Sequence, residues 1–127
     1  MLRFKNLGSG STGNATVVEG SSGGHTHRLL IDCGFGIRQL QARLAQAQLQ
    51  PEDLDAVFIT HEHSDHIGCA QALAVRYRLP VWMSEGTYDN MRAYIPNKKS
   101  KKDIDESSDT YDTIDWLVKN VENNNGN

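Results

Sequence analysis

The sequence has little of what several protein classes require. Only two of its 127 residues are cysteine, Cys33 and Cys69, and they form no Cys-x-x-Cys pair. We therefore expect free thiols rather than a disulfide framework. No apolar run approaches membrane-spanning length, and residues 1–5 lack the apolar segment of a signal peptide. These absences favour a cytoplasmic protein that does not enter a membrane.

A strong charge of either sign is also missing. Lysine and arginine number 13 and aspartate and glutamate 16, so no broad basic surface for nucleic acid is expected. This weakens a nuclease interpretation without excluding it, because metal ions can also hold phosphate. A chain of 127 residues is at most one modest domain.

The most informative stretch is residues 59–66, which contains three of the five histidines and follows an apolar run. In an extended or tightly turned segment, residues two apart point the same way. His61 and His63 can therefore point at one spot, with Asp65 and His66 directed at a neighbouring one. The alternative is a polar loop in which Ser64 or Asp65 caps a following helix.

Imidazole nitrogen and carboxylate oxygen are donors that zinc, manganese and iron accept. We therefore expect a divalent metal at these four residues, with zinc as the first choice and manganese or iron as alternatives. No histidine follows His66. Each of two adjacent ions would then have only two ligands from this stretch, which predicts weak binding.

Residues 60–66 (Thr-His-Glu-His-Ser-Asp-His) resemble the signature of the metallo-β-lactamase fold, a family of mostly zinc- or iron-dependent hydrolases. Residues 8–14 (Gly-Ser-Gly-Ser-Thr-Gly-Asn) and 30–34 (Leu-Ile-Asp-Cys-Gly) resemble a bacterial subgroup of exonucleases or related phosphodiesterases. The resemblance covers about residues 1–95. It implies an α/β fold, namely the N-terminal half of an αββα sandwich with one mixed sheet and helices on one face.

The resemblance also implies roles for individual residues. His61, His63, Asp65 and His66 would be metal ligands, and Asp65 would also be catalytic by orienting a metal-bound hydroxide. Asp32 would orient the histidine loop, although its position before Gly34 also suits a simple cap. Ser11 and Asn14, in the glycine-rich loop, would lie at the rim of the active site.

Periodicity predicts the individual elements. We expect strands at residues 2–7, 15–19, 27–32, 55–60 and 80–83, a turn at 20–24, a helical turn starting at Pro51, and helices at 37–48, 67–78, 86–94 and 109–121. His25 and His27 lie near the start of the third strand. His27 is then roughly 16 Å from Asp32 at about 3.3 Å per residue, so neither histidine is expected to bind metal.

The composition changes after residue 95. We predict a partial domain at 1–95, a polar linker at 96–108, and a C-terminal helix and tail at 109–127. Residues 109–121 resemble a helix of the α/β-hydrolase group that contains α-amino-acid ester hydrolases and X-Pro dipeptidases. The chain would then join pieces of two families.

Two functions remain open from the sequence. The first is a metal-dependent hydrolase acting on phosphodiester or ester bonds of a small molecule or nucleic acid. The second is a truncated or chimeric, non-catalytic fragment with an incomplete metal site. Such a fragment could form an oligomer or need a second half, and an exposed sheet face would support it.

Overall fold

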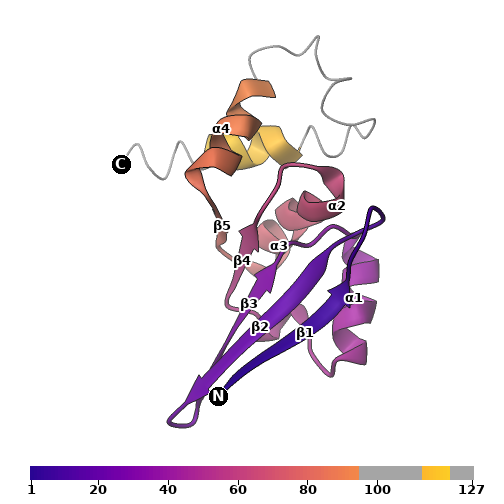
Figure 1. Ribbon diagram of the computed structural model, residues 1–127, viewed down its shortest axis with the longest axis vertical. Coiled ribbons are helices and arrows are strands. Elements are labelled where there is room, and N and C mark those ends of the chain that lie inside the picture. The colour runs from indigo at the N-terminus through magenta and orange to yellow at the C-terminus, as the bar shows by residue number, and fades with distance from the viewer. Residues whose placement is uncertain (95–112, 121–127) are drawn as a thin grey trace.

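A five-stranded mixed sheet is the centre of the fold in a computed structural model, which describes residues 1–94 and 113–120. The strand order is β1-β2-β3-β4-β5 (Figure 1). Antiparallel pairing joins the first three strands, and β4 and β5 extend the sheet in parallel. The strands are β1 (Leu2–Gly8), β2 (Ala15–Ser22), β3 (His25–Ile31), β4 (Ala56–Ile59) and β5 (Val81–Met83). The predicted mixed sheet is confirmed.

The β2–β3 hairpin is tighter than the sequence suggested. Ser22 pairs with His25, so the turn consists of Gly23 and Gly24 alone. Both have positive φ angles, 59° and 83°, as a two-residue hairpin turn of this hand requires. The predicted turn at residues 20–24 was therefore too long, because glycine and serine at 20–22 continue the strand.

The helices are α1 (Ile37–Gln46), the 3-10 turn η1 (Pro51–Asp53), α2 (Ser64–Ile67), α3 (Ala70–Tyr77) and α4 (Glu85–Tyr94), followed by a helix at residues 113–120. The helix predicted at 67–78 is present as α3, but it begins at Ala70 instead of residue 67. Gly68, with φ 25° and ψ −99°, separates it from α2. A Cβ atom at this glycine would lie 2.2 Å from the carbonyl oxygen of Cys33. Close backbone packing therefore causes the break.

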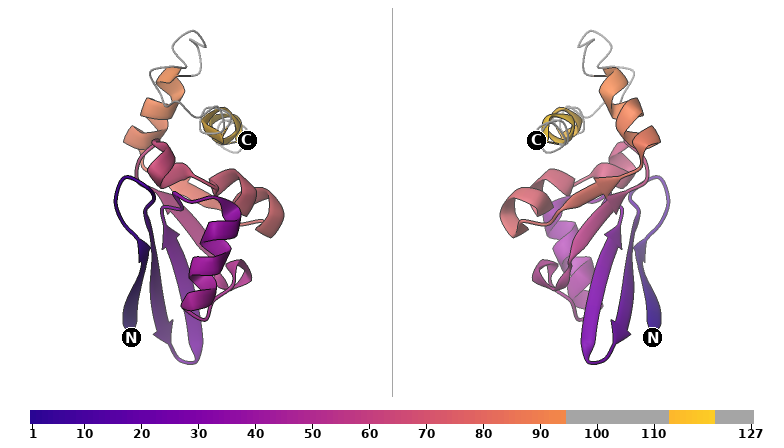
Figure 2. Two further views of the ribbon diagram at one scale, coloured as in Figure 1. Left: turned by 90° about the vertical axis from the view of Figure 1, so that its right-hand side faces the viewer. Right: turned by 90° about the vertical axis from the view of Figure 1, so that its left-hand side faces the viewer.

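One face of the sheet carries the core. Helices α1 and α3 lie against this face, as predicted (Figure 2). The fully buried side chains come from the inward positions of the strands and the apolar sides of the helices, and include Val17, Leu30, Leu40, Leu44, Val57, Ile59 and Leu73. In the C-terminal helix, Ile114, Leu117 and Val118 are also buried. The predicted linker at 96–108 lies outside the described residues, and the division into domains stays a prediction.

The opposite face of the sheet, which we call the open face, is largely apolar, and its strand residues include no lysine, arginine, aspartate or glutamate. Directly paired residues share a face, so the register defines its members: Leu2, Phe4, Asn6, Thr16, Val18, Gly20, Ser22, His25, His27, Leu29, Ile31, Ala56, Phe58 and Trp82. Leu2, Phe4 and Trp82 are 64%, 66% and 62% exposed. Figure 2 shows no described helix against this face.

The strand charges lie on the helix-covered face instead. Arg28 donates from Nε to Oε1 of Glu19 at 2.7 Å, and the Arg3 Nε atom lies 3.7 Å from the other carboxylate oxygen. The hydrogen bond from Arg28 lowers the pKa of Glu19. Lys5 reaches the carbonyl oxygen of Ala47 at the end of α1. The charged side chains of β1, β2 and β3 therefore lie on the helix-covered face and not on the open face.

Two neighbouring valines of β2 test this one-sided packing. Val17 is fully buried, whereas Val18 is only half-buried on the open face. We expect Val17→Ala to lower the free energy of unfolding by about 2 kcal/mol, and Val18→Ala to cost less than about half of that. Urea unfolding followed by circular dichroism measures both. Equal losses would show that the open face is covered.

Candidate metal-binding site

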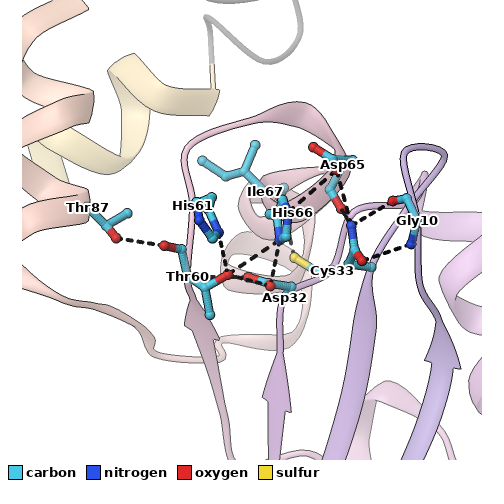
Figure 3. Close-up of polar contacts among 10 residues, drawn as sticks. Gly10, Asp32, Cys33, Thr60, His61, Asp65, His66, Ile67 and Thr87 are labelled. Atoms are coloured by element: carbon cyan, nitrogen blue, oxygen red, sulfur yellow. Dashed lines mark hydrogen bonds and ion pairs between the residues drawn. The ribbon is translucent and has the colours of Figure 1, made fainter.

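The site begins where two parallel strands end at the same edge of the sheet. Residues Leu29–Ile31 of β3 pair with Ala56–Phe58 of β4, so Asp32 and Thr60 follow their strands side by side. The Thr60 backbone N–H donates to Oδ1 of Asp32 at 2.8 Å, and its hydroxyl donates to Oδ2 at 2.6 Å (Figure 3). The buried Asp32 carboxylate thus holds the start of the histidine loop.

The same carboxylate orients His66. Nδ1 of His66 lies 2.7 Å from Oδ2 of Asp32 (Figure 3). Because an ionised carboxylate only accepts hydrogen bonds, this ring nitrogen carries a proton. In the neutral imidazole, Nε2 is then unprotonated, and it lies 3.5 Å from Oδ2 of Asp65. One ring nitrogen and one carboxylate oxygen, the atom types that bind zinc, therefore lie side by side.

The other two histidines are less constrained. The His61 ring centroid is 4.6 Å from that of His66 and 6.4 Å from that of His63. Both His61 and His63 are exposed. Nδ1 of His61 lies 3.0 Å from the Thr60 hydroxyl. Nε2 of His63 lies 4.0 Å from the buried Glu62 carboxylate. The structure therefore places His66 next to both His61 and Asp65, and His63 lies farther from His61 than His66 does.

The donors suit a divalent metal, but their arrangement is only partly formed. Imidazole nitrogen and carboxylate oxygen are zinc donors, and Asp65 and His66 already converge. Within residues 1–94 and 113–120, however, no three histidine, cysteine, aspartate or glutamate side chains are placed to hold one ion. His61 or His63 would have to rotate to supply a third donor. The residues fit a two-donor half of a site.

The glycine-rich loop lies directly beside Asp65. The Asn14 side chain donates from Nδ2 to the Asp65 carbonyl oxygen at 3.0 Å and to Oδ2 at 3.2 Å. Ser11 is exposed at the tip of the loop. Nothing in the sequence could reveal the contact of Asn14 with Asp65, because 51 residues separate them.

A glycine lets two backbone segments meet behind the site. A Cβ atom at Gly34 would lie 1.8 Å from the carbonyl oxygen of Asp65, so only glycine fits there. The Gly34 N–H donates to the Asn14 carbonyl, and the Cys33 N–H donates to the His66 carbonyl. The loop after β3 therefore packs against the backbone of Asp65 and His66, and the Gly34–Asp65 contact was not visible in the sequence.

Both cysteines lie under this site as free, buried thiols. The Cys33 Sγ atom contacts the carbonyl of Ile67 at 3.4 Å, and that of Cys69 lies 3.6 Å from the Cys33 carbonyl. Hydrogen bonding with Cys69 and burial raise the pKa of the Cys33 thiol. The two cysteines are thus packed as free thiols, in agreement with the expectation from the sequence.

The remaining histidines lie elsewhere. His25 begins β3 and His27 is two residues further on, at the end of the strand opposite Asp32. Nδ1 of His27 lies 3.7 Å from Oδ2 of Asp55. They are therefore separated from the candidate site by the length of the strand, as the sequence predicted.

With this geometry established, comparison with known proteins identifies the family. The profile of the metallo-beta-lactamase superfamily matches residues 8–124. The chain therefore belongs to the metallo-beta-lactamase superfamily. The match includes residues 109–121, for which the sequence also suggested a likeness to α/β-hydrolases; that second likeness stays a prediction.

Named relatives are nucleases. Exodeoxyribonuclease YycJ of Bacillus anthracis is 41% identical over 96 residues, which make up 76% of this chain and 35% of that protein. Exodeoxyribonuclease WalJ of Streptococcus pneumoniae serotype 2 is 37% identical over 106 residues, 84% of this chain and 36% of that protein. Ribonuclease Z of Pseudomonas putida is 47% identical over 53 residues, 42% of this chain and 15% of that enzyme. The chain spans about a third of the length of the two exodeoxyribonucleases.

A solved structure agrees on the fold. A B3 metallo-beta-lactamase with an active-site glutamic acid superimposes with a TM-score of 0.51 and 22% identity. The superposition covers 70% of this chain and 32% of that one. Among the residues that the structure describes, no helix is long and apolar enough to cross a membrane.

The Asp32 contacts predict a specific loss on substitution. Asp32 has a φ angle of 63°, which asparagine tolerates, so Asp32→Asn preserves the backbone while removing the charged acceptor. We expect the free energy of unfolding to fall by about 1–3 kcal/mol, because three hydrogen bonds weaken in a buried place. Asp89→Asn, at an exposed position of α4, is the control and should cost less than about 0.5 kcal/mol. Equal stabilities in urea would contradict the role of Asp32.

The packing of the cysteines predicts slow thiol chemistry. At pH 8 we expect neither thiol of the folded chain to react quickly with Ellman's reagent, because both side chains are buried and the Cys33 pKa is raised. In urea both should react at once. Fast labelling of the folded chain would show that the loop behind the site opens readily.

Proposed function

We propose that this chain carries part of the active site of a metal-dependent hydrolase that cleaves phosphodiester bonds, with nucleic acid as the substrate. The observation that carries the proposal is the alignment of Asp32, His66 and Asp65, which places Nε2 of His66 and the Asp65 carboxylate side by side. Membership of the superfamily and the nuclease names of the relatives support this assignment.

Each residue has a defined part in this proposal. Asp65 and His66 would hold one divalent ion, and His61 and His63 would hold a second. Zinc is proposed first, with manganese or iron as alternatives. When bound, the ions would activate water and neutralise charge on the phosphate. Asp32 keeps the proton on Nδ1 of His66, so that Nε2 stays available as a donor. Asp65 would also orient the attacking water.

A second candidate is a fragment that does not act alone. The open face favours it, because a largely apolar sheet face with Phe4 and Trp82 exposed is costly to leave in water. His61 and His63 are also exposed and only partly oriented. In this second reading, the chain needs further polypeptide, from a longer protein, a partner or another copy, to complete its ligand set.

Metal binding tests the ligand assignment. We expect zinc titrated into the purified chain to bind, and His66→Ala to weaken its affinity by at least about 10-fold because one of two converging donors is lost. His27→Ala removes a histidine at the far end of β3 and is the matched control, with affinity unchanged within about twofold. Isothermal titration calorimetry measures both. Equal affinities would contradict the site.

Hydrolysis separates the two candidate functions. The chain is incubated with zinc, manganese or iron and either bis(p-nitrophenyl) phosphate or single-stranded DNA. Turnover that is lost in His66→Ala and kept in His27→Ala would support an active hydrolase. If metal binds and neither substrate is cleaved, the fragment reading is supported for the isolated chain.

A further inference from the structure

Asn14 makes three polar contacts with Asp65. Its backbone N–H donates to the Asp65 carbonyl at 2.8 Å, and its side-chain Nδ2 donates to the same oxygen at 3.0 Å. Nδ2 also lies 3.2 Å from Oδ2 of Asp65. Figure 3 shows the Asp65 carboxylate with Gly10 on one side and His66 on the other. Residue 14 thus connects the glycine-rich loop to both the backbone and the carboxylate of residue 65.

The orientation of the Asn14 amide follows from its surroundings. Oδ1 accepts the Gly10 N–H at 3.0 Å, while Nδ2 donates to the Gly10 carbonyl at 2.8 Å. Turning the amide over would place oxygen against the Gly10 and Asp65 carbonyl oxygens, which cannot donate. Nδ2 therefore has to face Asp65, and the hydrogen bond to its carboxylate has a defined direction.

The Asp65 carboxylate depends on this contact. The side chain is only partly buried, and its Oδ2 atom is contacted by Nδ2 of Asn14 and faced by Nε2 of His66. The 3.2 Å hydrogen bond from Asn14 is shorter than the 3.5 Å separation from His66. The Asn14 amide therefore helps to fix which way this carboxylate points.

We infer that Asn14 is a positioning residue that holds the Asp65 carboxylate in the orientation that faces His66. The inference rests on the proposed function and assigns Asn14 a task at the metal site, beyond the place at the rim of the active site that the resemblance implies. Asn14 acts through Asp65. Removing its amide should therefore weaken metal binding only while the Asp65 carboxylate is present.

A double-mutant cycle on zinc affinity tests this dependence. We expect Asn14→Ala to raise the dissociation constant about 10-fold, in line with other groups that orient metal ligands. In the Asp65→Asn background the same substitution should change it less than about twofold. Asn6→Ala is the matched control, because the Asn6 side chain accepts the Gly8 N–H at the irregular end of β1, a contact local to that strand. It should change the affinity less than about twofold.

The alternatives give different results. An unchanged dissociation constant in Asn14→Ala with a raised KM for single-stranded DNA would mean that Asn14 contacts substrate, and would overturn the inference. An equal loss of affinity in both backgrounds would mean a general effect on folding, and would overturn it as well.

A measurement on the metal-free chain keeps the inference testable if zinc does not bind, an outcome that would contradict the proposed function itself. The side-chain amide signals of Asn14 in a 15N–1H NMR spectrum should shift in Asp65→Ala, because the carboxylate acceptor is removed. Shifted signals would uphold the contact independently of metal. Signals at the same positions in both spectra would overturn the positioning role.

Discussion

The buried Asp32 carboxylate is the interaction on which the site depends. It accepts hydrogen bonds from the Thr60 backbone, the Thr60 hydroxyl and His66. A buried carboxylate without partners would be very costly, so these donors have little freedom to leave. Its backbone has a φ angle of 63°, a conformation that aspartate adopts more readily than most residues. One strained, fully paired residue thereby ties β3, the end of β4 and the histidine loop together.

The sheet divides the chemistry of the chain between two sides. Ion pairs around Glu19 and the apolar core share the helix-covered face, while the open face has no permanent charge. Charged residues would normally protect an exposed sheet face from association. The lack of charged residues on the open face is expected of a surface that further polypeptide covers. The described residues therefore form a layer that is finished on one side only, which agrees with a match that covers about a third of the exodeoxyribonuclease relatives.

Sequence patterns predicted those parts of the structure that depend on local periodicity. The strands, α1 and the His25–His27 hairpin follow from alternation and helical spacing, and the mixed sheet is confirmed. The break at Gly68 and the Asn14–Asp65 contact could not be predicted. The break arises because the loop after β3 packs against a turn more than thirty residues away. The contact arises because the glycine-rich loop lies against Asp65, 51 residues further along the chain. Short stretches of sequence do not reveal such contacts between distant backbone segments.

The histidines differ in how firmly the fold holds them. Asp32 holds the His66 ring and Asn14 bonds to the Asp65 carboxylate. His66 and Asp65 therefore lose little conformational entropy when they bind a ligand. His61 and His63 are exposed, and the latter side chain is 60% accessible. Ordering such side chains costs free energy that a single ion has to supply. The chain thus organises one half of its donor set through residues of its own and leaves the other half to be ordered by whatever binds there.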